Sequence, residues 1–136
     1  MSEPGWALQK AVWSAVTNDT GVIQALGGPH VYDDVPRRTP LPYVTFGTSE
    51  VRDWSTGCED AHEHVMTLMV WTPARGRKRA AAIMEALRAA LHERALILDG
   101  HRLVSLRHDY SEVRREEDGE RLRGLVRFRA LSEPVV

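Results

Sequence analysis

Two strand-like segments separated by an Asp-Gly pair place the strongest constraint on how this chain folds. Apolar and polar residues alternate over about 102–115 and again over about 120–131, with Asp118 and Gly119 between them. A tight hairpin turn of type I′ needs positive φ at both central residues, and Asp-Gly supplies this readily. The sequence therefore predicts a C-terminal antiparallel hairpin.

Two further strands and three helices are expected before this hairpin. β-Forming residues predict strands over about 42–51 and 62–72, and apolar residues at helical spacing predict helices over about 6–17, over a short segment that stops at Gly27, and over about 75–92. The expected order is helix, helix, strand, strand, helix, strand, strand. It predicts an α+β fold in which a mostly antiparallel, four-stranded sheet packs against an N-terminal helical hairpin and one long helix.

Composition narrows the class of protein. The 136 residues show no interdomain linker, so residues 1–136 are expected to form a single domain, and four prolines between Pro29 and Pro42 predict an extended connector. With 18 Lys and Arg against 19 Asp and Glu, a general nucleic-acid coat is disfavoured. No segment is apolar enough to span a membrane, no secretory signal is visible, and a single cysteine suits a reducing cytosol.

One group of residues resembles a metal site. Cys58, Asp60, His62 and His64 lie close in sequence, and the two histidines would share one face of a strand. Thiolate and imidazole together suit zinc. No partner motif occurs elsewhere, and no nucleophile elbow or phosphate loop is present. We therefore expect no bound metal, no cofactor and no enzymatic activity.

Two groups of basic residues point instead to assembly surfaces. The start of the long helix carries Arg75, Arg77, Lys78 and Arg79, where the helix dipole makes each cation unfavourable by a few tenths of a kcal/mol. Either this is a solvated basic loop, or an acidic neighbouring subunit or a nucleic-acid backbone compensates it.

The second basic group forms a stripe along the last strand. Arg121, Arg123, Arg127 and Arg129 occupy one face, which Asp109 or Glu112 of the paired strand could partly neutralise. This stripe is either a charged solvent face or a surface turned toward a neighbour or a central channel.

Aromatic and acidic residues supply the remaining candidates. Trp54 lies in a polar loop beside Arg52 and Asp53, where an indole is best used as an interface anchor. The adjacent carboxylates Asp33 and Asp34 fit a turn or an interface. The strand over 62–72 has apolar groups on both faces, so it is either covered twice or meets a partner with one face.

Several segments, taken in order, resemble one protein family. They are His30–Pro36, Pro42–Gly47, Arg52–Thr56, Val70 with Trp71, Gly76–Lys78, Gly100–Leu106 and Arg127–Ala130. Together they are similar to the small phage tail-completion proteins, also called tail terminators, of tailed phages, prophages and gene transfer agents.

The resemblance implies a non-enzymatic structural subunit. Such subunits are expected to form a ring, usually hexameric, that caps the head-proximal end of the tail tube, ends its polymerisation and joins the tail to the head. The implied partners are further copies of the chain, the tail tube protein, the head–tail connector and DNA passing through without sequence-specific binding. The protein would assemble in the bacterial cytoplasm and then form part of the particle.

In this ring, the expected contact residues combine the family pattern and the charged groups. They are Asp33, Asp34, Arg52, Asp53, Trp54, Arg75, Arg77, Lys78, Arg79, Arg123 and Arg127. The basic helix start would face an acidic patch on the next subunit, either Asp33 and Asp34 or residues 116–118. Three alternatives stay open: another head–tail connector subunit, a nucleic-acid-binding module, and a small metalloenzyme.

Overall fold

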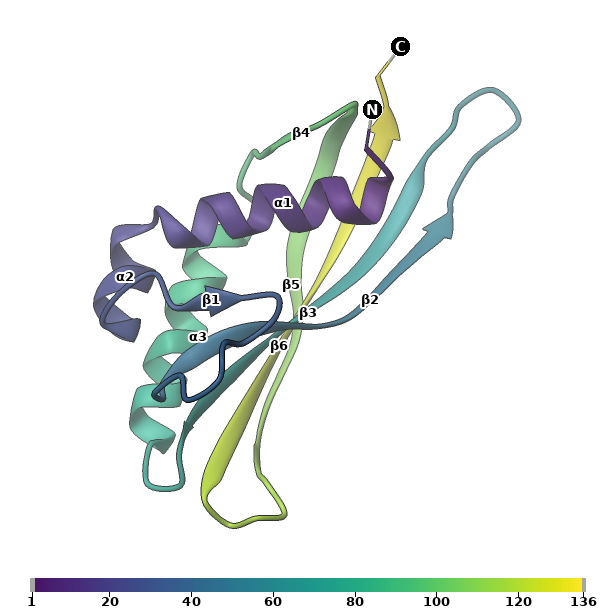
Figure 1. Ribbon diagram of the computed structural model, residues 1–136. Helices are drawn as coiled ribbons and strands as arrows, with labels where there is room; N and C mark the ends of the chain where they lie inside the picture. The colour runs from purple at the N-terminus through teal and green to yellow at the C-terminus, as the bar shows by residue number, and fades with distance from the viewer. Residues whose placement is uncertain (1, 136) are drawn as a thin grey trace.

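In a computed structural model that describes residues 2–135, the chain folds into a strongly twisted six-stranded sheet with helices on one face (Figure 1). The helices are α1 (Pro4–Thr17), α2 (Thr20–Leu26) and α3 (Arg77–Leu91). The strands are β1 (Val31–Tyr32), β2 (Tyr43–Asp53), β3 (His62–Pro73), β4 (Ile97–Leu98), β5 (His101–Arg115) and β6 (Arg121–Pro134). Their order across the sheet is β1-β2-β3-β6-β5-β4.

The expected fold class is wrong in strand number, element order and strand direction. The sheet has six strands rather than four, and it is mixed because β1 runs parallel to β2. Both additional strands, β1 and β4, contain only two residues, too few to produce a visible alternation in sequence. β1 forms within the proline-rich segment that was expected to be a plain connector, and the backbone N–H of Val44 donates to His30 O at 2.9 Å. The four long strands and the three helices lie where the sequence predicted them.

The C-terminal hairpin is confirmed, but its turn differs from the predicted type. β5 and β6 pair in antiparallel fashion up to Arg115, and the backbone N–H of Glu116 then donates to Arg121 O at 2.9 Å. The N–H of Gly119 donates back to Glu116 O at 3.0 Å. Gly119 has a φ of 71°, whereas Asp118 does not adopt positive φ, so the connection is wider than a two-residue turn.

Side chains that meet the helices form the core. Leu68 and Val70 of β3 and Phe128 of β6 are fully buried, and they pack in one cluster with Ile83 and Leu87 of α3. Since successive strand residues point to opposite faces, the other face of β3 points away from all three helices. The strand was expected either to be covered on both faces or to meet a partner with one face. Helices cover only one of its faces (Figure 1).

Local capping fixes where the first two helices begin. The Glu3 carboxylate accepts hydrogen bonds from the N–H groups of Gly5 and Trp6, each at 2.9 Å, and these bonds hold the pKa of Glu3 below its usual range. Asp19 accepts from the N–H of Val22 at 3.0 Å, and α2 ends at Gly27 with a φ of 83°. None of the helices within residues 2–135 has both the length and the apolar character needed to cross a bilayer.

Candidate interaction surfaces

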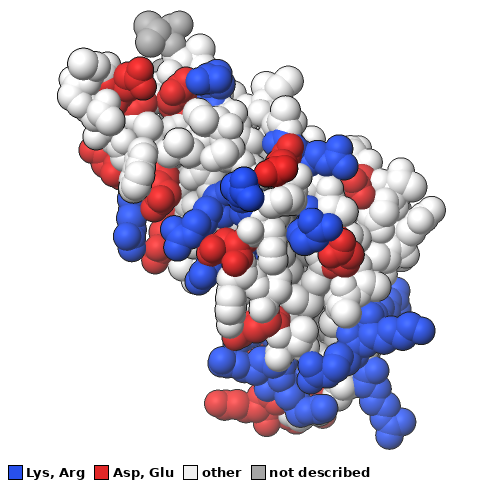
Figure 2. All heavy atoms as spheres, turned by 180° about the vertical axis from the view of Figure 1, so that it is seen from behind, with Lys and Arg blue, Asp and Glu red and all other residues white. Residues whose placement is uncertain are grey.

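The helix-free side of the sheet, which we name the open face, carries the arginine stripe. The register places Arg129 opposite Val65, Arg127 opposite Thr67 and Arg123 opposite Trp71 of β3. Figure 2, seen from behind the view of Figure 1, shows positive side chains over this side of the molecule and gathered toward its lower end, with acidic side chains among them. The sequence prediction of a guanidinium stripe on one face of β6 is confirmed.

Acidic and aromatic neighbours hold much of this stripe in place. Asp109 accepts a hydrogen bond from Arg127 Nε at 2.8 Å, and its Oδ2 lies 3.3 Å from Arg129 Nε. The Arg127 guanidinium lies 5.0 Å from the ring centre of Tyr110, a cation–π distance. The stripe is therefore partly neutralised within the chain by Asp109, one of the two expected partners, whereas Glu112 lies 3.7 Å from Arg114 of its own strand.

Arg123 differs from these arginines. Its Nε is buried and has no hydrogen-bond partner within residues 2–135. It lines a polar hollow of about 450 Å³ with Arg114, Arg115, Arg121 and residues 116–118. A buried, unpaired donor costs free energy, and the carboxylates of Glu116, Glu117 and Asp118 line the same hollow.

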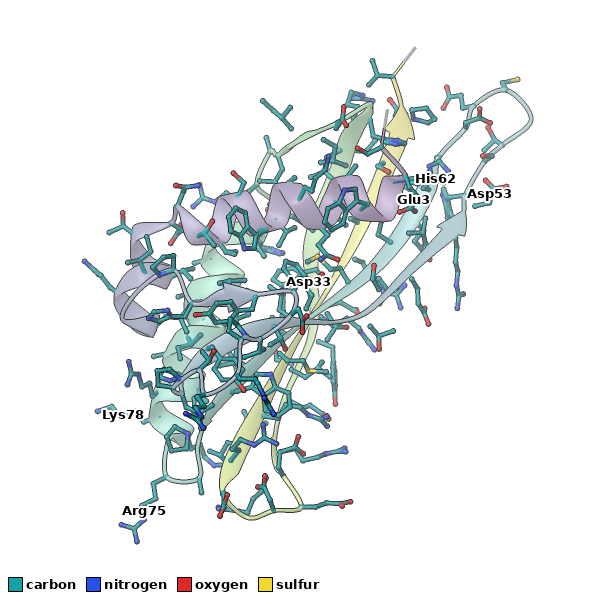
Figure 3. All side chains as sticks on the ribbon, in the orientation of Figure 1. Glu3, Asp33, Asp53, His62, Arg75 and Lys78 are labelled. Carbon is teal, nitrogen blue, oxygen red and sulfur yellow. The ribbon has the colours of Figure 1, made fainter. Side chains whose placement is uncertain are left out.

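The basic start of α3 divides into exposed and structural residues. Arg75 and Lys78 point into solvent at the far end of the molecule (Figure 3). Arg77 is the first residue of α3 and follows Gly76, an N-cap residue that has no side chain to accept a hydrogen bond. Arg79 instead donates to the carbonyl oxygen of Leu26 at 3.4 Å. Arg79 therefore supports the C-terminal end of α2, where a cation is favourable.

The end of β2 and the following loop position Arg52, Asp53 and Trp54. The hydroxyl and backbone N–H of Ser55 hold the pKa of Asp53 below its usual range. Trp54 is 56% exposed although its backbone N–H donates to Ala61 O at 2.9 Å. With open-face residues that include Arg129, its ring lines a hollow of about 320 Å³.

Asp33 and Asp34 lie in a bend just after β1. Asp33 accepts from Gln9 Nε2 at 2.9 Å, which ties this bend to α1. Figure 3 shows Asp33 near the middle of the molecule, with Asp53 toward one end and Arg75 and Lys78 at the other. The chain thus does not gather its candidate residues into one site but distributes them over separate surfaces.

Two tryptophans of α1 form a surface that the sequence analysis missed. Trp6 and Trp13 are 50% and 48% exposed, whereas Val12 and Val16 of the same helix are buried. Both line a pocket of about 220 Å³ together with Phe46. Their i,i+7 spacing puts them on the same flank of α1, a signal that the sequence already held.

The candidate metal residues do not form a metal site. Cys58 is exposed in the β2–β3 loop, whereas His64 is buried and hydrogen-bonded through Nε2 to Ser132 Oγ at 2.8 Å. Burial, followed by repulsion from His62, lowers the pKa of His64 to about 4. Across residues 2–135, no group of three or more His, Cys, Asp or Glu side chains is arranged to hold a metal ion.

A family model and solved structures match this chain. The family described as tail completion protein gp17 matches residues 10–133. A solved chain from the virion of a native gene transfer agent particle is 34% identical, with a TM-score of 0.86, over 94% of this chain and 96% of that chain. A second solved protein, 15% identical, covers 96% of this chain and 92% of its own with a TM-score of 0.53, and it shows the fold alone. A search of curated proteins found no match.

Proposed function

Because the chain belongs to the tail completion protein gp17 family and is a structural subunit of a phage-like tail, we propose that it caps the head-proximal end of the tail tube. Six copies form a closed ring that ends tube polymerisation and offers a docking surface to the head–tail connector. DNA passes through this ring without sequence-specific binding. The subunit assembles in the bacterial cytoplasm, performs no catalysis and then stays in the particle.

The similarity to a gene transfer agent virion chain is the observation that carries this proposal. The two chains are 34% identical over nearly the full length of both, and their folds match with a TM-score of 0.86. That relative is part of an assembled particle. A role as a particle subunit is therefore the function that best fits this chain.

The distribution of surfaces supports a ring. A head-to-tail ring requires each subunit to present two different surfaces to its two neighbours. Asp53 lies toward one end of the molecule and the cations Arg75 and Lys78 lie at the other (Figure 3). Such separated, unlike surfaces suit heterologous contacts.

The arginine stripe gives less support to a nucleic-acid-binding module. Arg127 and Arg129 are held by Asp109, so their charges are partly balanced before any DNA arrives. A formal net charge of -1 also opposes strong non-specific binding to DNA.

Electron microscopy of tail tubes tests the proposal. Purified protein is mixed with tail tubes of its own particle, and tube lengths and end structures are compared with and without it. We expect a cap at one end of each tube and an arrest of tube growth. Uncapped tubes that keep growing would contradict the proposal, and binding to the connector instead of the tube would identify another head–tail joining subunit.

A further inference from the structure

Two long strands of the sheet have uncovered edges on opposite sides of the molecule. β1 covers β2 only at Val44 and Thr45, so the edge of β2 is free over residues 49–54. On the other side, β4 covers only the first two residues of β5, and the N–H of Glu93 donates to the O of Leu106 at 2.7 Å. The edge of β5 is therefore free over residues 110–115, and free strand edges are ready sites for a further strand.

The directions of these two strands allow the sheet to continue from one copy to the next. β2 pairs antiparallel with β3, β3 with β6, and β6 with β5, so β2 and β5 run in opposite directions. Copies related by rotation about a ring axis keep the same orientation. β5 of one copy would thus lie antiparallel to β2 of its neighbour, and the two could form an antiparallel ladder.

The free backbone groups of β2 belong to its odd-numbered residues. The N–H of Trp54 donates to Ala61 O, directly opposite on the β3 side. In an antiparallel pair, every second residue directs its N–H and C=O to the same neighbour. Glu50, Arg52 and Trp54 therefore bond toward β3, which leaves the groups of Ser49, Val51 and Asp53 directed outward.

The free backbone groups of β5 also belong to odd-numbered residues. The N–H of Glu116 donates to Arg121 O on the β6 side, and the register is unbroken from there back to Tyr110. Residues 110, 112 and 114 therefore bond toward β6, and those at 111, 113 and 115 direct their groups outward. Odd-numbered residues of the two free edges can thus pair with one another.

One register satisfies the backbone and the side chains together. With Val51 opposite Val113, the free segments of equal length, 49–54 and 110–115, overlap completely, and two half-buried valines meet on the helix side. The open-face neighbours then pair Glu50 with Arg114, Arg52 with Glu112, and Trp54 with Tyr110. Two opposite-charge pairs and one aromatic pair are all favourable across antiparallel strands.

The isolated chain leaves these side chains ready for such partners. Glu50 lies 3.9 Å from Arg52, and Glu112 lies 3.7 Å from Arg114, each within its own strand. Trp54 and Tyr110 are 56% and 41% exposed. Beside the free edge of β5 lies a hollow of about 260 Å³, where an incoming valine could contact Ala81, Met84 and Val113; Glu85, Arg88, His108 and Ser111 also line it.

We propose that β2 of one copy adds to the free edge of β5 of the next copy in this register, so that the sheets of the ring form one continuous surface. The inference rests on the proposed ring, and its partner is a second copy of this chain. A symmetric contact between two copies of β2 would also pair opposite charges, because Glu50 of each copy could face Arg52 of the other. The hollow beside Val113 favours the contact between β2 and β5 instead.

Disulfide trapping tests the register. In a Cys58→Ser background, the double variant Glu50→Cys with Arg114→Cys places the two thiols at directly opposed, non-hydrogen-bonded positions, where β-carbons lie about 4.5–5.5 Å apart. Under mild oxidation we expect a ladder of covalent oligomers beyond the dimer. The matched control, Glu50→Cys with Glu112→Cys, shifts the register by two residues and should give much less product.

Charge exchange provides a second test. Arg114→Glu places like charges opposite each other and should raise the concentration needed for assembly by about threefold to tenfold. Adding Glu50→Arg to the Arg114→Glu variant should restore assembly. The control combines Glu50→Arg with Arg115→Glu, whose positions do not face each other in this register, and it should not restore assembly. An absence of restoration would overturn the proposed pairing.

The outcomes separate this inference from the proposed function. If the double cysteine variant caps tubes but forms no ladder of covalent oligomers, either in solution or on the tube, the β2–β5 pairing is overturned and tube capping stays intact. A ladder without capped tubes would support the pairing and refute the capping role. Covalent dimers from the single variant Glu50→Cys, without higher oligomers from the double variant, would show a symmetric β2 contact and overturn the inference.

Discussion

Acidification should destabilise the fold through His64. This side chain is 1% exposed, its Nδ1 has no hydrogen-bond partner within residues 2–135, and His62 lies nearby on the same strand face. Burial first, and repulsion from His62 and His101 in addition, lowers the pKa of His64 from 6.5 to about 4, although Glu3 opposes the shift. Between these two pKa values the unfolded chain binds more protons than the folded chain, so the free energy of unfolding falls as the pH falls.

The size of this effect follows from the two pKa values. From about pH 7.5 to about pH 5, proton binding by His64 in the unfolded state alone removes about 2 kcal/mol of stability. Most of this loss in the free energy of unfolding occurs below pH 6.5, the pKa of His64 in the unfolded chain. The loss levels off near pH 4, the pKa of His64 in the folded chain.

Urea denaturation at the two pH values, followed by tryptophan fluorescence, measures the effect. His64→Asn keeps a polar partner for Ser132 without a titrating ring, so it should remove about 2 kcal/mol from the pH-dependent difference while lowering stability at neutral pH. Gln24→Ala, at an exposed position of α2 and without a titrating group, is the control and should keep the wild-type difference. An unchanged difference in His64→Asn would refute the assignment of the pH dependence to this residue.

Three further substitutions test the packing and the surfaces. Phe128→Ala removes a fully buried ring and should lower the free energy of unfolding by about 3–5 kcal/mol in urea titrations; a loss below about 1 kcal/mol would contradict the core assignment. Asp109→Ala removes the acceptor of Arg127 and should cost about 1 kcal/mol at low salt and less at high salt; a salt-independent loss would contradict an electrostatic origin. Arg79→Ala should cost about 0.5–1 kcal/mol because α2 loses a C-terminal contact, whereas Lys78→Ala should change stability little; equal losses would contradict this distinction.

Long elements could be predicted from the sequence because their periodicity is local. Alternation over β5 and β6 and the Asp118-Gly119 pair located the hairpin, although the turn geometry was not that of the predicted type. The two-residue strands β1 and β4 could not be predicted, since two residues carry no period. The parallel pairing of β1 with β2 depends on tertiary packing of a proline-rich segment.

Candidate surfaces were predictable in their residue types but not in their arrangement. The arginine stripe followed directly from alternation in β6, and its partner Asp109 followed from the expected strand pairing. The structural role of Arg79 and the exposure of Trp6 and Trp13 depend on where α2 and β1 pack. The free edges of β2 and β5 could not be identified without knowing which strands lie at the rims of the sheet.

Electron microscopy of particles assembled without this chain tests the capping role most directly. If the chain ends tube growth and joins tail to head, its loss should give tubes longer than normal that are not attached to heads, and added protein should restore both features. Tails of normal length joined to heads in the absence of the chain would contradict the account.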